Sequence, residues 1–197
     1  MTAAQFDEFW RATYPETGPI SHLFRHAYPD RWLRIHSLPE LQRYATTAAD
    51  WRILFNRQQY LLTDLLGNNK EILLVTGAYE FNNNLLPTDA TPIGGLTDLE
   101  FTLSERLDLH QLEPEHHQPG DYYQPMFSEQ RWQFERFKPL LQEIANFQEK
   151  AFFISQRNAC LVAPYDGGVD IVLKDKTTRD FCRKVYQAWL SPLPSGL

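Results

Sequence analysis

The segment Pro164–Asp170 carries two carboxylates on either side of a glycine pair, Gly167-Gly168. Asp166 and Asp170 could act together in acid–base catalysis, or they could bind a metal ion. The same segment fits a β-hairpin, because Asp-Gly-Gly supplies the positive φ angles of a tight turn. We favour the hairpin, in which Asp170 lies just inside the returning strand and faces away from its apolar neighbours.

The segment Arg25–Arg57 is basic, with six arginines against three acids. Arg31 and Arg34 could clamp a phosphate or a carboxylate through bidentate hydrogen bonds, with His36 close by. The alternative, which we favour, is that the arginines pair with acids elsewhere and that Trp32 fills the core. The small-ligand candidates of the chain are nevertheless these five residues: Arg31, Arg34, His36, Asp166 and Asp170.

Histidines and acids also gather further along the chain, at His110, Glu113, Glu115, His116, His117 and Asp121. Zinc can be bound by two histidines and a carboxylate. Here the two adjacent histidines would point in different directions on any regular element, and neither cysteine is near. We therefore interpret this stretch as a solvated polar loop, and we predict neither a metal site nor a cofactor.

The strongest charge feature is acidic. Between Glu80 and Asp121 there are nine acids and one arginine, a local charge of −8 in a chain whose net charge is −6. One interpretation is a solvated loop face that helps solubility. The other is a surface that attracts a basic partner protein, for which complementary charge raises the association rate. The candidate partner-binding residues are Asp98, Glu100, Asp108, Glu113 and Glu115.

Helices are predicted where apolar residues recur at i, i+3 and i+4. The clearest is an amphipathic helix near 48–66, which Thr47 and Asp50 open with a capping box. A last helix near 176–190 is expected to bury Phe181, Val185, Ala188 and Trp189. Ser37-Leu38-Pro39-Glu40 has a helix-start pattern, and Pro139 is expected at the first position of a helix over 139–147.

Strands are predicted where apolar residues alternate or run without a helical stripe. A buried strand is expected over 71–79, and alternation over 99–109 predicts a strand with Asp98, Glu100 and Asp108 on its polar side. Three short strands, 151–155, 160–165 and 169–173, predict an antiparallel meander. The fold class is therefore α+β, with a mostly antiparallel sheet in one domain over 1–197 and a weak lobe boundary near 111–124.

Composition excludes several function classes. A net charge of −6 in 197 residues argues against nucleic-acid binding. Two cysteines are too few for a disulfide-stapled secreted domain. The apolar runs are far shorter than the roughly 20 residues that cross a bilayer, and the N-terminus has no signal-peptide pattern. We expect a cytoplasmic protein that does not contact a membrane.

Two blocks of sequence resemble a known family. The first is Arg31-Trp32-Leu33-Arg34-Ile35-His36-Ser37-Leu38-Pro39-Glu40, and the second is Pro164–Asp170 followed by Tyr186-Gln187-Ala188-Trp189-Leu190-Ser191. They are similar to a bacterial family of uncharacterised domains of unknown function. The resemblance covers the ends of the chain well and Glu80–Tyr123 poorly. It implies no activity, cofactor or catalytic residue, although some such domains accompany bacterial toxins as immunity proteins.

Two functions remain open. The first is a non-enzymatic immunity- or antitoxin-like domain that binds a basic protein through the acidic segment. The second is a small enzyme or ligand-binding domain for a phosphate- or carboxylate-bearing substrate. The first predicts a flat acidic patch without a deep polar pocket. The second predicts that the basic segment and the two aspartates share a concave site. The sequence favours the binding protein and leaves the oligomeric state open.

Overall fold

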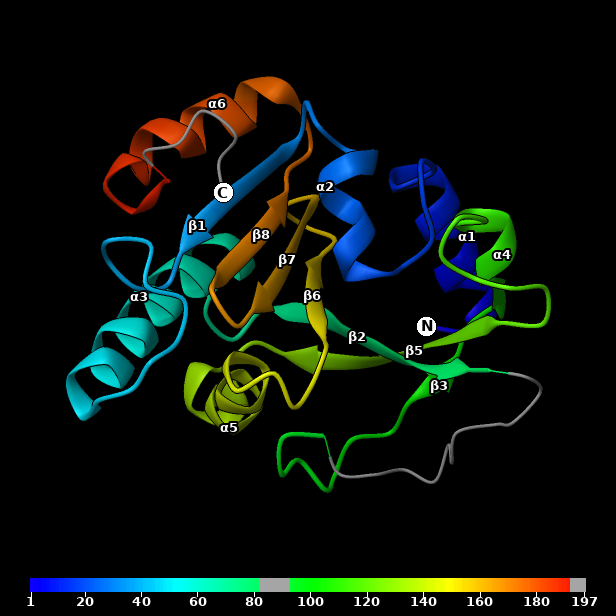
Figure 1. Cartoon of the computed structure of the whole chain (residues 1–197), viewed down its shortest axis with the longest axis horizontal. Helices are drawn as coiled ribbons and strands as arrows, with labels where there is room; N and C mark the ends of the chain where they lie inside the picture. Colours follow the sequence, from blue (N-terminus) through cyan, green and yellow to red (C-terminus); the bar gives the residue numbers. More distant parts are fainter. Residues whose placement is uncertain (82–92, 192–197) are drawn as a thin grey trace.

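The computed structural model describes residues 1–81 and 93–191 of the chain. Its centre is one antiparallel sheet with the strand order β1-β8-β7-β6-β2-β5-β3, and β4 also pairs with β5 (Figure 1). The strands are β1 Trp32–His36, β2 Glu71–Glu80, β3 Thr102–Leu103, β4 Leu107–Asp108, β5 Tyr122–Arg131, β6 Phe152–Ser155, β7 Cys160–Tyr165 and β8 Gly168–Val172.

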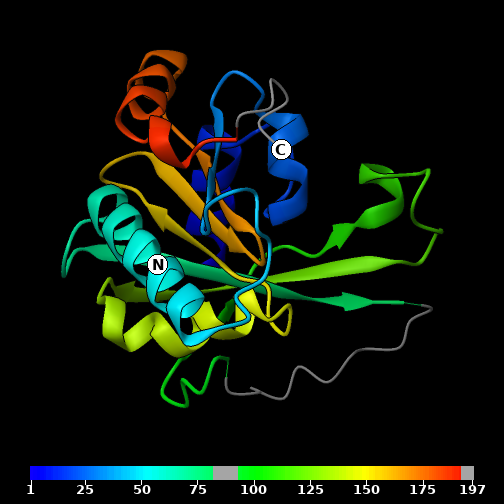
Figure 2. The same cartoon turned by 60° about the vertical axis from the view of Figure 1, so that its left-hand side comes forward.

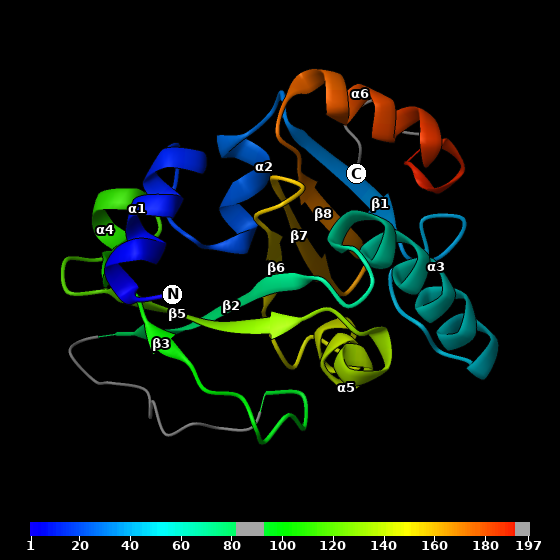
Figure 3. The same cartoon turned by 180° about the vertical axis from the view of Figure 1, so that it is seen from behind.

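Helices cover both faces of the sheet. Figures 2 and 3 show α3 and α5 together on one face, and Figure 1 shows α1 and α2 on the opposite side. The helices are α1 Ala3–Thr13, α2 Phe24–Ala27, α3 Ala48–Leu66, α4 Leu109–Leu112, α5 Phe134–Ala145 and α6 Lys176–Val185, with short 3₁₀ helices η1 Ser21–Leu23 and η2 Gln187–Trp189. The predicted α+β class is confirmed.

The side chains of each strand point alternately to the two faces of the sheet, and this explains why the protein has a core on each face. On β8, Val169 and Ile171 contact the core under α3, α5 and α6, whereas Val172 contacts the core under α1 and α2. A strand exposes successive side chains to opposite faces, so each short apolar strand supplies both cores. This explains why the strands of the predicted meander, β6 to β8, read as continuous apolar runs, and they pair consecutively.

Trp132 ties the sheet to both helices of its face. It is fully buried, its ring stacks on Phe137 of α5 at 5.5 Å, and its Nε1 donates to Thr63 Oγ1 of α3 at 3.1 Å. α3 itself begins as predicted, since Thr47 and Asp50 form the capping box. Hydrogen bonds from the Thr46 and Thr47 backbone lower the pKa of Asp50 to about 2.

Two predicted helix starts are wrong. Residues 37–40 form no helix: Ser37 and Leu38 are buried, and Glu40 has a positive φ of 54°. α5 begins at Phe134, so Pro139 lies inside the helix rather than at its first position. The apolar stripe that α5 buries outweighs the cost of an internal proline, which is about 3 kcal/mol.

The alternating stretch 99–109 forms only the two-residue strands β3 and β4. Asp98 and Glu100 precede β3, and Asp108 ends β4 and caps α4. The structure therefore does not place these three acids on one strand face. The tight pairing of β5 with β2 along ten residues uses one edge of β5 fully, and only short pieces of 99–109 reach its other edge.

The last helix is shorter than predicted: α6 ends at Val185 and a 3₁₀ helix follows over Gln187–Trp189. Ala188 is exposed and Trp189 is half-buried, so neither is buried as predicted.

The buried stripe of α6 also lies one residue further along the chain. Phe181 and Val185 are 65% and 48% exposed, and Cys182 and Tyr186 are buried in their place. Both pairs have the i, i+4 spacing of one helix face, so spacing alone could not choose between them. Burial raises the pKa of both Cys182 and Tyr186, whose hydroxyl also contacts Asp64 of α3.

We predict that Tyr186→Ala lowers the free energy of unfolding by about 3 kcal/mol or more, because it removes a buried aromatic ring. Phe181→Ala, five residues earlier on the same helix, should change it by less than about 0.5 kcal/mol because the ring is mostly exposed. Urea unfolding of both variants tests this prediction. A larger loss for Phe181→Ala would mean that α6 packs on its other face.

Candidate functional site

A buried ion pair joins the edge strand β1 to β8. The register places Arg34 directly opposite Asp170. Arg34 Nε donates to Asp170 Oδ1 at 2.7 Å and Nη2 donates to Oδ2 at 2.8 Å, and both side chains are largely buried. This is the bidentate geometry that guanidinium and carboxylate groups favour. It leaves Nη1 of Arg34 without a hydrogen-bond partner among the described residues.

Aromatic rings enclose this pair. The guanidinium carbon of Arg34 lies 4.5 Å from the ring centroid of Tyr165 and 5.4 Å from that of Trp32. Burial lowers the pKa of Arg34, but its hydrogen bonds to Asp170 and the charge of Asp170 raise it further, so the guanidinium stays charged. Burial also raises the pKa of Tyr165, which keeps the phenol neutral. The pair is therefore a fixed charged element of the sheet.

The turn between β7 and β8 holds the second aspartate. Asp166 is 3% exposed and accepts a hydrogen bond from Arg43 Nε at 2.9 Å. The hairpin forms, but neither Gly167 nor Gly168 has a positive φ, so that part of the prediction is wrong. Space explains the glycine at 168: a Cβ there would lie 2.2 Å from the Ile35 carbonyl oxygen, which belongs to the paired strand β1.

Arg31 and His36 are placed elsewhere. Arg31 donates to the carbonyls of Leu173 and Thr13, so it ties β8 to the end of α1. His36 Nε2 is buried and has no partner among the described residues. Burial, followed by the nearby charges of Arg34 and Arg57, lowers the pKa of His36. Neither side chain lines the cavity around Arg34.

A cavity of about 320 Å³ contains Arg34, Asp166 and Asp170 on one side. Its other walls are η1 and α2, which contribute Ser21, His22, Arg25 and His26, and the loop between α5 and β6, which contributes Phe147, Glu149 and Lys150. The structure thus brings together three of the five predicted ligand residues. It adds the 147–150 loop, for which the sequence holds no signal, because the loop is more than a hundred residues from Arg34.

The cavity holds cations that no acid neutralises. Arg25 lies over the Trp32 ring, with its guanidinium carbon 5.5 Å from the centroid, and Lys150 Nζ lies within 6 Å of the ring centroids of both Tyr79 and Phe147. Within residues 1–81 and 93–191, neither forms an ion pair. Glu149 is half-buried, and burial together with the charge of Glu143 raises its pKa. This arrangement leaves a net positive end to the cavity.

The model of one family, described as "Domain of unknown function (DUF3885)", matches residues 20–194. The chain belongs to this family. The match begins at residue 20, so it includes every wall of the cavity and leaves out α1. No curated protein and no solved structure matches the chain. In the part of the chain that the structure describes, no helix is long and apolar enough to cross a membrane.

Most of the described acids of the 80–121 segment have polar partners on the protein. Six of its eight described acids have a partner on the protein: Glu80 with Arg106, Asp98 with Arg136, Glu105 with Arg11, Asp108 with the Gln111 backbone, Glu113 with His22, and Asp121 with the Gln118 backbone. Glu100 and Glu115 are exposed. The ninth acid, Asp89, lies outside the described residues. Arg11 and Arg136, which lie outside the segment, therefore offset two of its negative charges.

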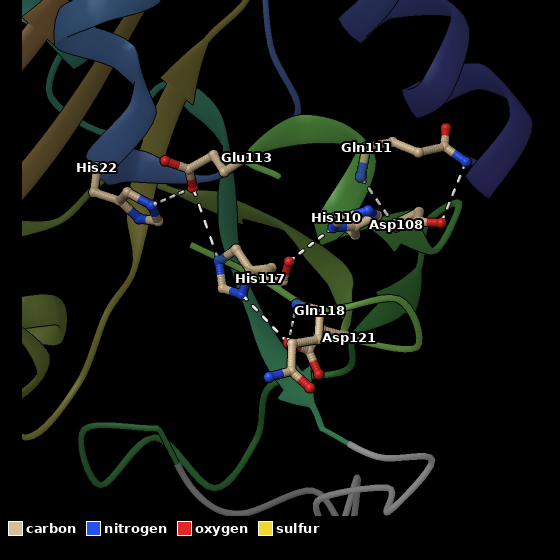
Figure 4. Close-up of polar contacts among 8 residues, drawn as sticks. All are labelled: His22, Asp108, His110, Gln111, Glu113, His117, Gln118 and Asp121. Atoms are coloured by element: carbon tan, nitrogen blue, oxygen red, sulfur yellow. Dashed lines mark hydrogen bonds and ion pairs between the residues drawn. The ribbon is translucent and has the colours of Figure 1, made fainter. Parts of the chain in front are cut away.

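Figure 4 shows how three histidines contact the acids and the backbone of this segment. His22 Nε2 lies 3.2 Å from Glu113 Oε2, and His117 lies between Glu113 and Asp121 at 3.9 and 3.7 Å. His110 Nδ1 lies 2.8 Å from the carbonyl oxygen of His117. Over the residues described, no group of three or more histidines, cysteines or acids is placed to hold a metal ion. The network connects η1 to the 113–121 loop.

We predict that Asp170→Asn lowers the free energy of unfolding by about 3–5 kcal/mol, because it leaves the Arg34 charge buried without its counter-ion. The matched variant Asp166→Asn should cost less than about 1 kcal/mol, since its partner Arg43 is 59% exposed and remains hydrated. Chemical unfolding at pH 7 measures both. A loss in Asp170→Asn as small as that in Asp166→Asn would show that the Arg34 guanidinium is hydrated.

The lowered pKa of His36 predicts a stability that depends on pH. The unfolded chain binds a proton at His36 near the ordinary pKa of 6.5, and the folded protein does so only at lower pH. The free energy of unfolding should therefore fall as pH drops below about 6.5. His36→Phe should remove part of this fall, measured by urea unfolding between pH 7.5 and 5.5. His116→Phe, at an exposed position, serves as the control and should keep the slope.

Proposed function

We propose that this domain binds a small ligand through a phosphate or carboxylate group in the cavity between α2, the β7–β8 hairpin and the 147–150 loop. The observation that carries the proposal is the convergence of Arg25, Arg34, Arg43 and Lys150 on one concave site. Arginine and lysine are the side chains that bind oxyanions most strongly, through charge-assisted hydrogen bonds. A cavity of this size, with a few convergent polar groups, is typical of small-molecule sites.

Charge balance supports an anionic ligand. Asp170 and Asp166 are already paired with Arg34 and Arg43, so they do not oppose a ligand's charge. Arg25 and Lys150 remain, and Glu149 is the one acid of the cavity without an ion pair among the described residues. An oxyanion placed there would gain at least two cationic partners.

The fixed position of Arg34 also supports binding. Its two hydrogen bonds to Asp170 and its contact with the Tyr165 ring hold the guanidinium in one orientation, so little side-chain entropy is lost when a ligand binds to Nη1. Asp170 would then act on the ligand through Arg34 rather than directly.

The proposal is for binding rather than catalysis. Both cavity aspartates accept hydrogen bonds from arginines, so neither has the free carboxylate of a general base. A basic protein partner has weaker support, because six of the eight described acids of the 80–121 segment already have partners within the domain. Three of these acids form ion pairs with arginines, which lowers the charge that could attract a basic partner.

Titration calorimetry with inorganic phosphate and with citrate, at low ionic strength, tests the proposal. Each anion should bind, and the double change Arg25→Gln and Lys150→Gln should weaken binding by at least tenfold, about 1.4 kcal/mol, because it removes two charge-assisted contacts. Arg157→Gln changes an exposed arginine far from the cavity and should leave affinity unchanged. Equal weakening by Arg157→Gln would reveal nonspecific attraction, and no binding of either anion would contradict the proposal.

A further inference from the structure

A second cavity adjoins the first. It has a volume of about 260 Å³ and shares four residues with the first cavity, Ser21, Phe147, Glu149 and Lys150. Its remaining lining is mostly aromatic and aliphatic, from Ile20, Tyr79, Tyr123 and Phe152. The two cavities therefore form one groove between η1–α2 and the 147–150 loop, cationic at one end and aromatic at the other.

Two aromatic rings lie near one flexible cation at this junction. Lys150 Nζ lies 5.7 Å from the Tyr79 ring centroid and 5.9 Å from the Phe147 ring centroid. The lysine side chain is exposed, whereas its backbone is fixed because Thr76 Oγ1 donates to its carbonyl at 2.7 Å. The ammonium group can therefore move toward an anion in the first cavity and free the space between the rings.

The backbone at Phe147 is unusual. It lies just beyond α5 with a positive φ of 61°, in the left-handed region that glycine and asparagine normally occupy after a helix. A bulky residue there is strained. Packing does not explain it, since the ring is 70% exposed. The strained loop holds an aromatic ring in solvent at the mouth of the groove.

The opposite wall is preformed. Tyr79 and Tyr123 have ring centroids 4.9 Å apart, and Tyr123 is almost fully buried. Gly77 makes room for this arrangement, since a Cβ there would lie 2.4 Å from the Tyr123 ring. Burial raises the pKa of both tyrosines, which keeps their phenols neutral. This end of the groove is thus a rigid aromatic surface.

We propose that the groove binds a planar aromatic ring joined to an anionic group, the chemistry of a nucleoside monophosphate or of an aryl phosphate. The ring lies between Phe147 and Tyr79, and the anion meets Arg25, Arg34 and Lys150. The inference rests on the proposed function, because the anion anchors the ligand. A ring stacked on aromatic side chains adds affinity that a sugar or an inorganic ion cannot obtain.

Four probes test the inference by titration calorimetry: AMP, phenyl phosphate, ribose 5-phosphate and inorganic phosphate. We expect AMP or phenyl phosphate, or both, to bind at least tenfold more tightly than the two probes that lack a ring. Tighter binding of AMP than of phenyl phosphate would identify the ligand as a nucleotide. Tighter binding of phenyl phosphate would identify it as an aryl phosphate. Binding of inorganic phosphate with no advantage for either ring would overturn this inference and leave the proposed function intact, whereas no binding of any probe would overturn both.

The variant Phe147→Gly tests the role of the Phe147 ring in binding without disturbing the fold. Glycine suits the positive φ, so the melting temperature should stay unchanged or rise. The tenfold advantage of the aromatic probes should be lost, while the affinity for inorganic phosphate stays within about twofold. Phe181→Gly removes an exposed ring of α6 and should leave the advantage unchanged. Retention of the advantage in Phe147→Gly would overturn the placement of the ring between Phe147 and Tyr79.

Discussion

The bidentate pair of Arg34 and Asp170 is the interaction on which the candidate site depends. It lies at one position of the β1–β8 register, and a slip of β1 by one residue would turn Arg34 toward the apolar core under α3 and α5 and leave Asp170 without its partner. Two buried charges are tolerated only when they satisfy each other. The pair therefore specifies how the edge strand β1 joins the sheet, and the same pairing presents a fixed guanidinium to the cavity.

The two walls of the groove differ in how they pack. One wall is η1 and the four-residue helix α2, whose Phe24 is fully buried in the core under α1 and α2. The other wall is the 147–150 loop, which contributes no residue to either core and contains the left-handed Phe147. Positions that cost stability without improving packing are found most often at functional sites. The groove fits this pattern, while the buried face of each helix explains the stability of the rest.

The acidic segment shows that the charge counted along a stretch of sequence does not predict the charge of the folded surface. Its excess of acids suggested a patch for a basic partner, yet residues of distant elements pair with several of these acids: Arg11 comes from α1, Arg136 from α5 and His22 from η1. The segment also has apolar contacts, since Ile93 and Leu109 are buried. Polar pairs and apolar packing therefore both hold this segment on the rest of the fold.

Local patterns in the sequence determined much of the fold. The capping box and the i, i+3, i+4 stripe defined α3, and short apolar runs separated by turns defined β6, β7 and β8. These signals are reliable because a helix or a hairpin is made by residues that are near in sequence. Where two patterns were equally local, as for the two possible stripes of α6 or for Pro139 in α5, the sequence could not decide.

The tertiary structure alone decided the site. Arg31 and Arg34 are three residues apart and chemically identical, yet one ties β8 to α1 and the other faces the cavity. The partner of Arg34 is 136 residues away, and that of Arg43 is 123 residues away. Lys150 and Phe147 reach the groove because packing of α5 against the sheet brings their loop there. Such contacts depend on how the whole sheet is ordered, since a buried charge takes the counter-ion that the folded chain places beside it, wherever that residue lies in the sequence.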